Sequence, residues 1–137
     1  MKDSVVVTIP SHPKYLSMVR AVTVSMGKLY GIKDTIIEDI KLAVDEACSN
    51  VIKHAYRGDT SKKIVIKYNN MQNGLAVIIE DNGIKANLKS IKGRSLDDVR
   101  PGGLGIHFIK RVFDVFKFDD KKKKGNRLIL IKYREKE

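Results

Sequence analysis

Apolar and polar positions follow two different periods along this chain of 137 residues. Short runs rich in β-branched residues are typical of strands. Asn73-Gly74 separates two such runs and predicts a hairpin turn. The lysines at 121–124 are expected in the turn of a second hairpin. The predicted strands cover residues 5–9, 63–68, 75–80, 115–118 and 128–131.

Other stretches have apolar residues three or four positions apart, as on one face of a helix. The first is expected to begin with a cap at Ser11 and to end at Gly31, because glycine readily terminates helices. The second should run from a cap at Asp34 to about Tyr56, and the third covers residues 104–112. Helices before and between hairpins, without strict alternation of strand and helix, predict an α+β fold. We expect a two-layer sandwich with helices on one face of a mixed, mainly antiparallel sheet.

The length of the chain predicts one domain over residues 1–137. The low cysteine content indicates a reducing compartment. No apolar run approaches the roughly 18 residues of a membrane span, so no membrane is expected among the partners. Cys48 is the single cysteine, so no intramolecular disulfide can form. The cytoplasm is therefore the expected location.

The formal net charge is +11, from 27 basic and 16 acidic residues. Such a charge favours polyanions, including nucleic acid, nucleotides and acidic protein surfaces. The lysines are scattered, however, and lack the interleaved exposed aromatic residues that single-strand binders use. A solvated basic surface is therefore favoured, and direct nucleic-acid binding is not expected.

The second predicted helix carries a line of polar side chains beside its apolar stripe. Glu46, Asn50 and His54 lie four residues apart, and this spacing puts them on one face of an α-helix. Asn50 can offer Mg²⁺ a hard carbonyl oxygen, with phosphate oxygens and waters completing the shell. Glu46, one turn earlier, can take a proton from an attacking hydroxyl. The alternative is a helix whose polar side merely meets water.

A second candidate segment, Asp81-Asn82-Gly83, follows a continuous apolar strand. Asp81 is expected at the end of the sheet near the core. Gly83 would let the backbone pass close to a bound base, where a Cβ would obstruct it. The alternative is an ordinary turn, for which this tripeptide is also common.

The third segment, Gly102-Gly103-Leu104-Gly105, opens the last predicted helix. Glycines let backbone amides approach phosphate oxygens, and the helix directs its positive end at them. The spacing matches neither the dinucleotide fingerprint nor a Walker loop. A flexible helix entry is the alternative when this segment is considered alone.

In this order and spacing, the three segments resemble the nucleotide site of the GHKL ATPases. The tract from Asp45 to Tyr56 resembles that of the small anti-sigma factor serine kinases of bacteria, and the likeness covers nearly the whole chain. The resemblance implies the histidine-kinase-like ATPase (Bergerat) fold, with ATP and Mg²⁺ bound and Asp81 accepting the adenine amino proton. Lys53 could touch phosphates or complement the helix dipole, and His54 could approach phosphates or pack beside the site.

The resemblance also implies a partner-switching function. Such a protein holds a sigma factor inactive, phosphorylates a serine on an anti-anti-sigma (STAS-type) antagonist and forms a homodimer. The alternative is a catalytically silent ATP-dependent binding module; retention of Glu46 beside Asn50 favours the kinase. The chain departs from the family where Asn126 follows Gly125, because a threonine is common there. The charge-rich stretch 84–101 is expected to be a lid.

Overall fold

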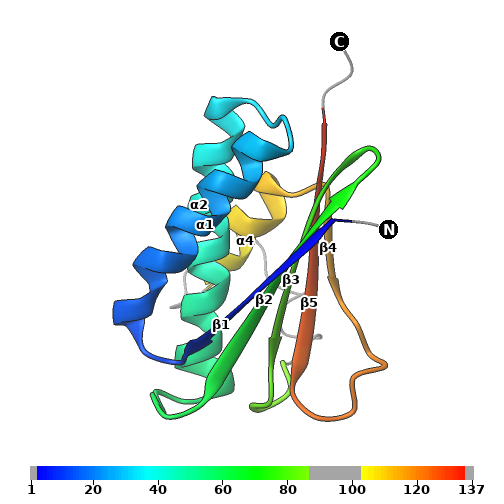
Figure 1. Cartoon of the computed structure of the whole chain (residues 1–137). Coiled ribbons are helices and arrows are strands. Elements are labelled where there is room, and N and C mark those ends of the chain that lie inside the picture. Colours follow the sequence, from blue (N-terminus) through cyan, green and yellow to red (C-terminus); the bar gives the residue numbers. More distant parts are fainter. Residues whose placement is uncertain (1–2, 87–102, 135–137) are drawn as a thin grey trace.

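The computed structural model describes residues 3–86 and 103–134. Figure 1 shows two layers, a twisted sheet and a set of helices that covers one of its faces. The sheet has five strands in the order β1-β2-β3-β5-β4, and each neighbouring pair is antiparallel. The strands are β1 (Ser4–Pro10), β2 (Lys63–Met71), β3 (Gly74–Asp81), β4 (Val115–Phe118) and β5 (Asn126–Tyr133).

The helical layer consists of α1 (Leu16–Leu29), α2 (Asp34–Asn50) and α4 (Gly103–Val112), with short turns η1 (Pro13–Tyr15) and η2 (Val51–Ala55). The two-layer α+β sandwich predicted from the hydrophobic periods is confirmed. No helix in the described ranges is both long and apolar enough to cross a bilayer.

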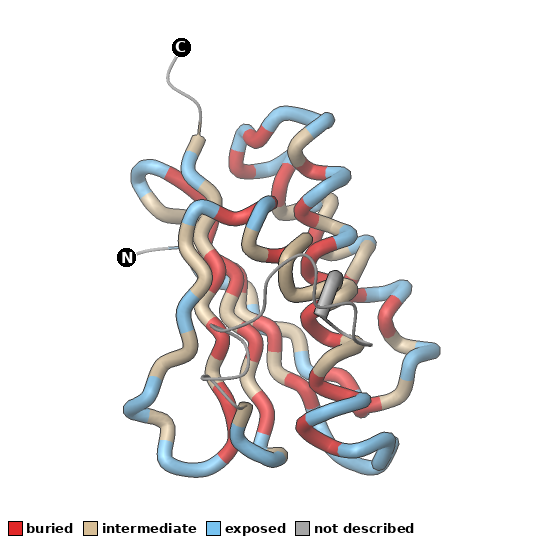
Figure 2. Tube along the Cα trace, turned by 180° about the vertical axis from the view of Figure 1, so that it is seen from behind, coloured by how far each residue is buried: buried red, intermediate tan, exposed pale blue. Residues whose placement is uncertain are grey.

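The core lies between the two layers. Side chains alternate along β2, so Ile64, Ile66 and Tyr68 are fully buried against the helices. The Tyr68 hydroxyl also finds a buried partner, because it lies 2.7 Å from Thr23 Oγ1 on α1. Figure 2 shows buried positions recurring along the strands and along the helix sides that meet them. The sheet therefore holds α2 and the end of β3 in fixed relative positions.

Two predicted helix caps are wrong. Ser11 is fully buried, and its hydroxyl donates to the Asp59 carbonyl at 2.7 Å and accepts from the Lys62 amide at 3.0 Å. It therefore ties the end of β1 to the loop before β2, and His12 caps the η1 turn instead. Asp34 is the first residue of α2 rather than its cap. The predicted end of α1 is confirmed, since Gly31 has φ of 78°.

The predicted first hairpin is confirmed, but its turn lies one residue earlier than expected. Met71 pairs with Gly74, so Gln72 and Asn73 form the loop and Gly74 belongs to β3. Gly74 serves packing there, because a Cβ would overlap the Lys132 carbonyl of β5. The lysines at 121–124 lie between β4 and β5, as expected.

Candidate functional site

The polar edge of α2 faces the first turn of α4. Glu46 and Asn50 are half-buried, and neither side chain makes a hydrogen bond or ion pair with another described residue. A Cβ built on Gly105 would overlap the Glu46 carboxylate, so the Glu46 side chain lies directly against the Gly105 backbone at the start of α4. The first and third sequence segments therefore meet in space.

The helix containing Glu46 changes character after Asn50. Residues Val51–Ala55 form a π-helical turn, closed by a 2.9 Å bond from the Tyr56 amide to the Val51 carbonyl. A π turn has slightly more residues than an α turn, so the four-residue spacing from Asn50 to His54 falls just short of a full turn instead of just beyond it. The π turn shifts His54 around the helix axis relative to a continuous α-helix, and its place beside the nucleotide stays a prediction. His54 and Lys53 are exposed.

The second segment meets the end of this same helical stretch. Gly83 packs on the Ala55 carbonyl so closely that a Cβ would overlap it, and the Ile84 amide donates to that carbonyl at 2.8 Å. From the sequence, the lack of a Cβ at Gly83 is expected to make room for a bound base. The structure gives a further reason, which is contact with η2.

Asp81 is a buried carboxylate at the last position of β3, with 3% of its surface exposed. Its Oδ1 accepts a 2.8 Å bond from the Gly83 amide. Burial raises the pKa of Asp81, whereas the bonds from Gly83 and Asn126 and the nearby Lys122 lower it, leaving a net increase. The polypeptide thus keeps a carboxylate in a site where the charged form is costly, a feature enriched at functional sites.

Asn126, at the start of β5, contacts both carboxylate oxygens of Asp81. Its Nδ2 donates to Oδ1 and Oδ2 of Asp81 at 3.1 and 3.3 Å. In the sequence, Asn126 stands out only as a departure from the family, and its contact with Asp81 is not predicted. The observation that reveals this contact is the pairing of Asp81 with Asn126 across β3 and β5, and strand pairing is known only from the tertiary structure.

Tyr56 is a second residue whose position the sequence argument missed. Its hydroxyl donates to the Lys63 carbonyl at 2.6 Å and accepts from the Asn82 amide at 2.9 Å. Burial is the main cause that raises the pKa of Tyr56, so the hydroxyl stays protonated at neutral pH. Tyr56 therefore links the end of η2, the start of β2 and the end of β3.

Comparison with known proteins agrees with this arrangement. Residues 9–132 match the histidine kinase-like ATPase domain. The chain belongs to this family. It is 30% identical over 143 aligned positions to a protein named serine-protein kinase RsbW from Listeria innocua, covering 97% of this chain and 88% of that protein. The RsbW of Bacillus subtilis is 27% identical, over 82% of this chain and 75% of its own length.

A solved structure gives the same fold assignment for this histidine kinase-like ATPase domain. The RsbU and RsbW domains of a Mycobacterium tuberculosis protein align with a TM-score of 0.66 and 15% identity. The alignment covers 96% of this chain but 32% of that longer chain. At this identity the likeness supports the fold alone.

The remaining predicted site residues lie at or beyond the edge of the described structure. Gly103 is the first residue of α4, whereas Gly102 lies outside the described residues. The predicted lid, 84–101, is described only at residues 84–86. Within 3–86 and 103–134, no group of three or more His, Cys, Asp or Glu side chains could hold a metal. The carbonyl oxygen of Asn50, together with phosphate oxygens and waters, is a donor set that suits Mg²⁺, and its role as a ligand stays a prediction.

Proposed function

We propose that this chain is an anti-sigma serine kinase that binds Mg-ATP, holds a sigma factor inactive and phosphorylates a serine on an anti-anti-sigma antagonist. Near-full-length similarity to proteins named serine-protein kinase RsbW supports this proposal. The structural observation that carries it is the Glu46 carboxylate. It has no partner among the described residues, lies against Gly105 at the start of α4, and precedes Asn50 by one turn.

The proposed roles follow the chemistry of each group. Asp81 accepts the adenine amino proton, Asn50 gives its carbonyl oxygen to Mg²⁺, and backbone amides at the start of α4 contact phosphate oxygens. Glu46 accepts the proton of the antagonist's serine hydroxyl while the serine oxygen bonds to the γ-phosphorus. The bond between that phosphorus and the oxygen of the departing ADP breaks in the same transfer, so charge and protons balance.

Protein partners, oligomeric state and cellular location are proposed as well. A sigma factor and a STAS-type antagonist are the proposed protein partners, the chain acts as a homodimer, and the site of action is the cytoplasm. Lys53 and His54 are exposed positions within η2, where side chains can reach phosphate groups without first breaking a hydrogen bond or ion pair to another described residue. Their contact with nucleotide stays a prediction.

Glu46→Gln tests the kinase directly. The substitution keeps size and removes the base, so transfer of labelled γ-phosphate should fall by about 10²–10⁴-fold, with ATP affinity unchanged. Glu38→Gln is the matched control, because Glu38 lies on the same helix and pairs at the surface with Lys41. Single-turnover transfer and ATP affinity are measured for both variants.

The outcomes separate two functions. Equal transfer by wild type and Glu46→Gln would remove the proposed base. ATP-dependent capture of partners without transfer to any antagonist would instead identify a catalytically silent binding switch.

A further inference from the structure

The Asn126 side chain is saturated by contacts within the protein. Besides its bonds to both Asp81 oxygens, Nδ2 donates to the Ile84 carbonyl at 2.9 Å. Its Oδ1 accepts from the Ala86 amide at 2.8 Å. An amide has two donor hydrogens, and both are used here. Asn126 is therefore not positioned to offer a ligand a free donor, although it is 8% exposed and lies beside the proposed base site.

These bonds determine which oxygen of Asp81 remains available. Among the described side-chain contacts of Asp81, Oδ1 receives donors from Gly83 and Asn126, whereas Oδ2 receives the longer contact from Asn126. A buried carboxylate stays ionised only when donors or opposite charges compensate its lost hydration. Within the described part of the chain, the other charged or titratable groups that act on Asp81 are Lys122, in the turn before β5, and Tyr56, after η2.

The same amide also fixes the backbone that leaves β3. Ile84 and Ala86 are held by opposite ends of one side chain, and Ile84 is additionally bound to the Ala55 carbonyl. Gly125 makes this geometry possible from the other side, because it has φ of 74° and a Cβ there would overlap the Asp81 carbonyl. The carboxylate and residues 84–86 are thus parts of one bonded unit.

We infer that Asn126 is a positioning residue that makes Asp81 selective for the amino group of adenine and couples base binding to the placement of residues 84–86. The inference rests on the proposed ATP binding. Selectivity follows because adenine carries an amino donor where guanine carries a carbonyl acceptor, which an ionised carboxylate repels. Asn126 acts through Asp81 and does not itself contact the base.

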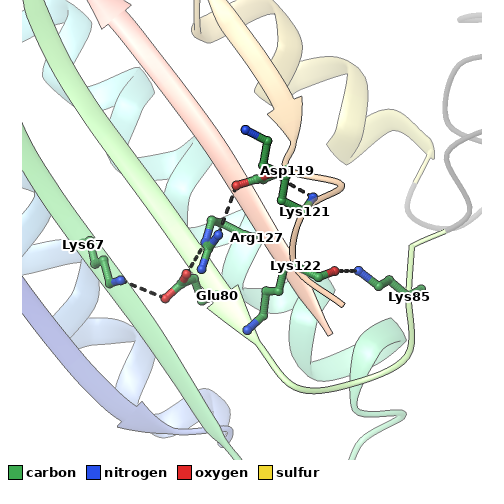
Figure 3. A network of polar contacts seen from close by, with 7 residues as sticks. All are labelled: Lys67, Glu80, Lys85, Asp119, Lys121, Lys122 and Arg127. Atoms are coloured by element: carbon green, nitrogen blue, oxygen red, sulfur yellow. Dashed lines mark hydrogen bonds and ion pairs between the residues drawn. The ribbon is translucent and has the colours of Figure 1, made fainter. Parts of the chain in front are cut away.

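Two substitutions separate the parts of this role. Asn126→Asp keeps the size and the acceptor for the Ala86 amide, but it places a second carboxylate against Asp81. Asn126→Leu removes all the side-chain bonds. The control is Arg127→Gln at the next position, whose side chain lies on the opposite sheet face and pairs with Glu80 and Asp119 (Figure 3).

Affinities for ATP and GTP are measured across pH, and hydrogen exchange is followed at Ala86. Both Asn126 variants should lose about tenfold or more of the preference for ATP over GTP. Their ATP affinity should begin to fall at a higher pH than in wild type, because loss of a donor or addition of a like charge raises the pKa of Asp81. Exchange at the Ala86 amide should accelerate in Asn126→Leu and remain slow in Asn126→Asp, and Arg127→Gln should match wild type in all three measurements.

Wild-type protein supplies a test that does not depend on the variants folding. The side-chain amide signals of Asn126 in an NMR spectrum should shift with adenosine and not with inorganic tripolyphosphate. An unchanged ATP preference in both variants, or no shift with adenosine in a wild type that binds ATP, overturns the role of Asn126. Failure of wild type to bind ATP at all overturns the proposed function instead.

Discussion

At the scale of single residues, the site combines close backbone approaches with a buried charge. Gly105 and Gly83 stand where a Cβ would overlap Glu46 and Ala55, respectively. Asp81 has a raised pKa because its burial outweighs the bonds that it receives. The charged form of Asp81 is therefore kept at a cost to folding, as expected of a group retained for binding.

Asp81→Asn should separate binding from stability. Loss of the charge-assisted acceptor is expected to weaken ATP binding by about 1.5–3 kcal/mol. The sign for stability is opposite, because a carboxyl group whose pKa is raised in the folded state destabilises that state once ionised. Thermal unfolding at pH 7 should therefore give a midpoint equal to or above that of wild type, and isothermal titration gives the ATP affinity.

Asn50→Ala is the companion variant. It should weaken Mg-ATP binding without the rise in unfolding midpoint that Asp81→Asn allows. Unchanged ATP affinity in both variants would contradict the site. A clearly lower unfolding midpoint in Asp81→Asn would contradict the electrostatic argument.

At the scale of elements, the site depends on how α2 ends. The π turn Val51–Ala55 and the following Tyr56 bring the end of the helix to β2 and β3 together. Arg57 and Gly58 continue with φ of 49° and 81°, and the Gly58 amide returns to the Ile52 carbonyl at 2.7 Å. This junction, rather than α2 alone, sets the position of Asn82 and its neighbours.

Tyr56→Phe tests the junction. The variant keeps the ring but leaves the Lys63 carbonyl and the Asn82 amide without their shared partner. Unfolding free energy in urea should fall by about 1–3 kcal/mol. ATP affinity should fall as well, because Asn82 adjoins Asp81. Tyr133→Phe is the control, since that side chain is 40% exposed, and equal stability of the two variants would contradict the linking role.

At the scale of the whole molecule, the close packing of α2 against the sheet buries the thiol of Cys48. This thiol can therefore report global unfolding. Cys48 has no exposed surface, and burial together with the nearby Asp45 raises its pKa to about 12. The reactive thiolate is therefore absent at neutral pH in the folded protein. Reaction with a thiol reagent requires opening of the layer contact.

Labelling of Cys48 by a disulfide reagent should therefore be slow and should follow the unfolding equilibrium. ATP at 100 times its dissociation constant should slow labelling by roughly 100-fold, because ligand binding stabilises the folded state. Ser61→Cys, at an exposed position, supplies a thiol that should react fast with or without ATP. Rapid labelling of Cys48 in the native protein would contradict the buried position.

The local sequence determined the type of each described strand and of α1, α2 and α4, but not the short turns η1 and η2. Periods of two and about 3.6 depend only on neighbouring residues, so the strands and helices were placed to within a few residues. The three candidate segments could also be identified from the sequence, because carboxylate, amide and glycine residues are visible in each segment by itself. The single domain, the homodimer, the lid and the roles of Gly102 and Leu104 stay predictions.

Contacts between distant residues were decided by the tertiary structure alone. Ser11 was predicted to be a helix cap from its neighbours alone. Its actual partners, Asp59 and Lys62, are distant in sequence and could not be recognised there. The π turn interrupts a periodicity that continues in the sequence, since apolar residues suit both kinds of helix. Strand register set Asn126 opposite Asp81, and helix packing set Gly105 against Glu46. Such pairings depend on how whole layers fit together, so the hydrophobic pattern that builds each layer leaves them undetermined.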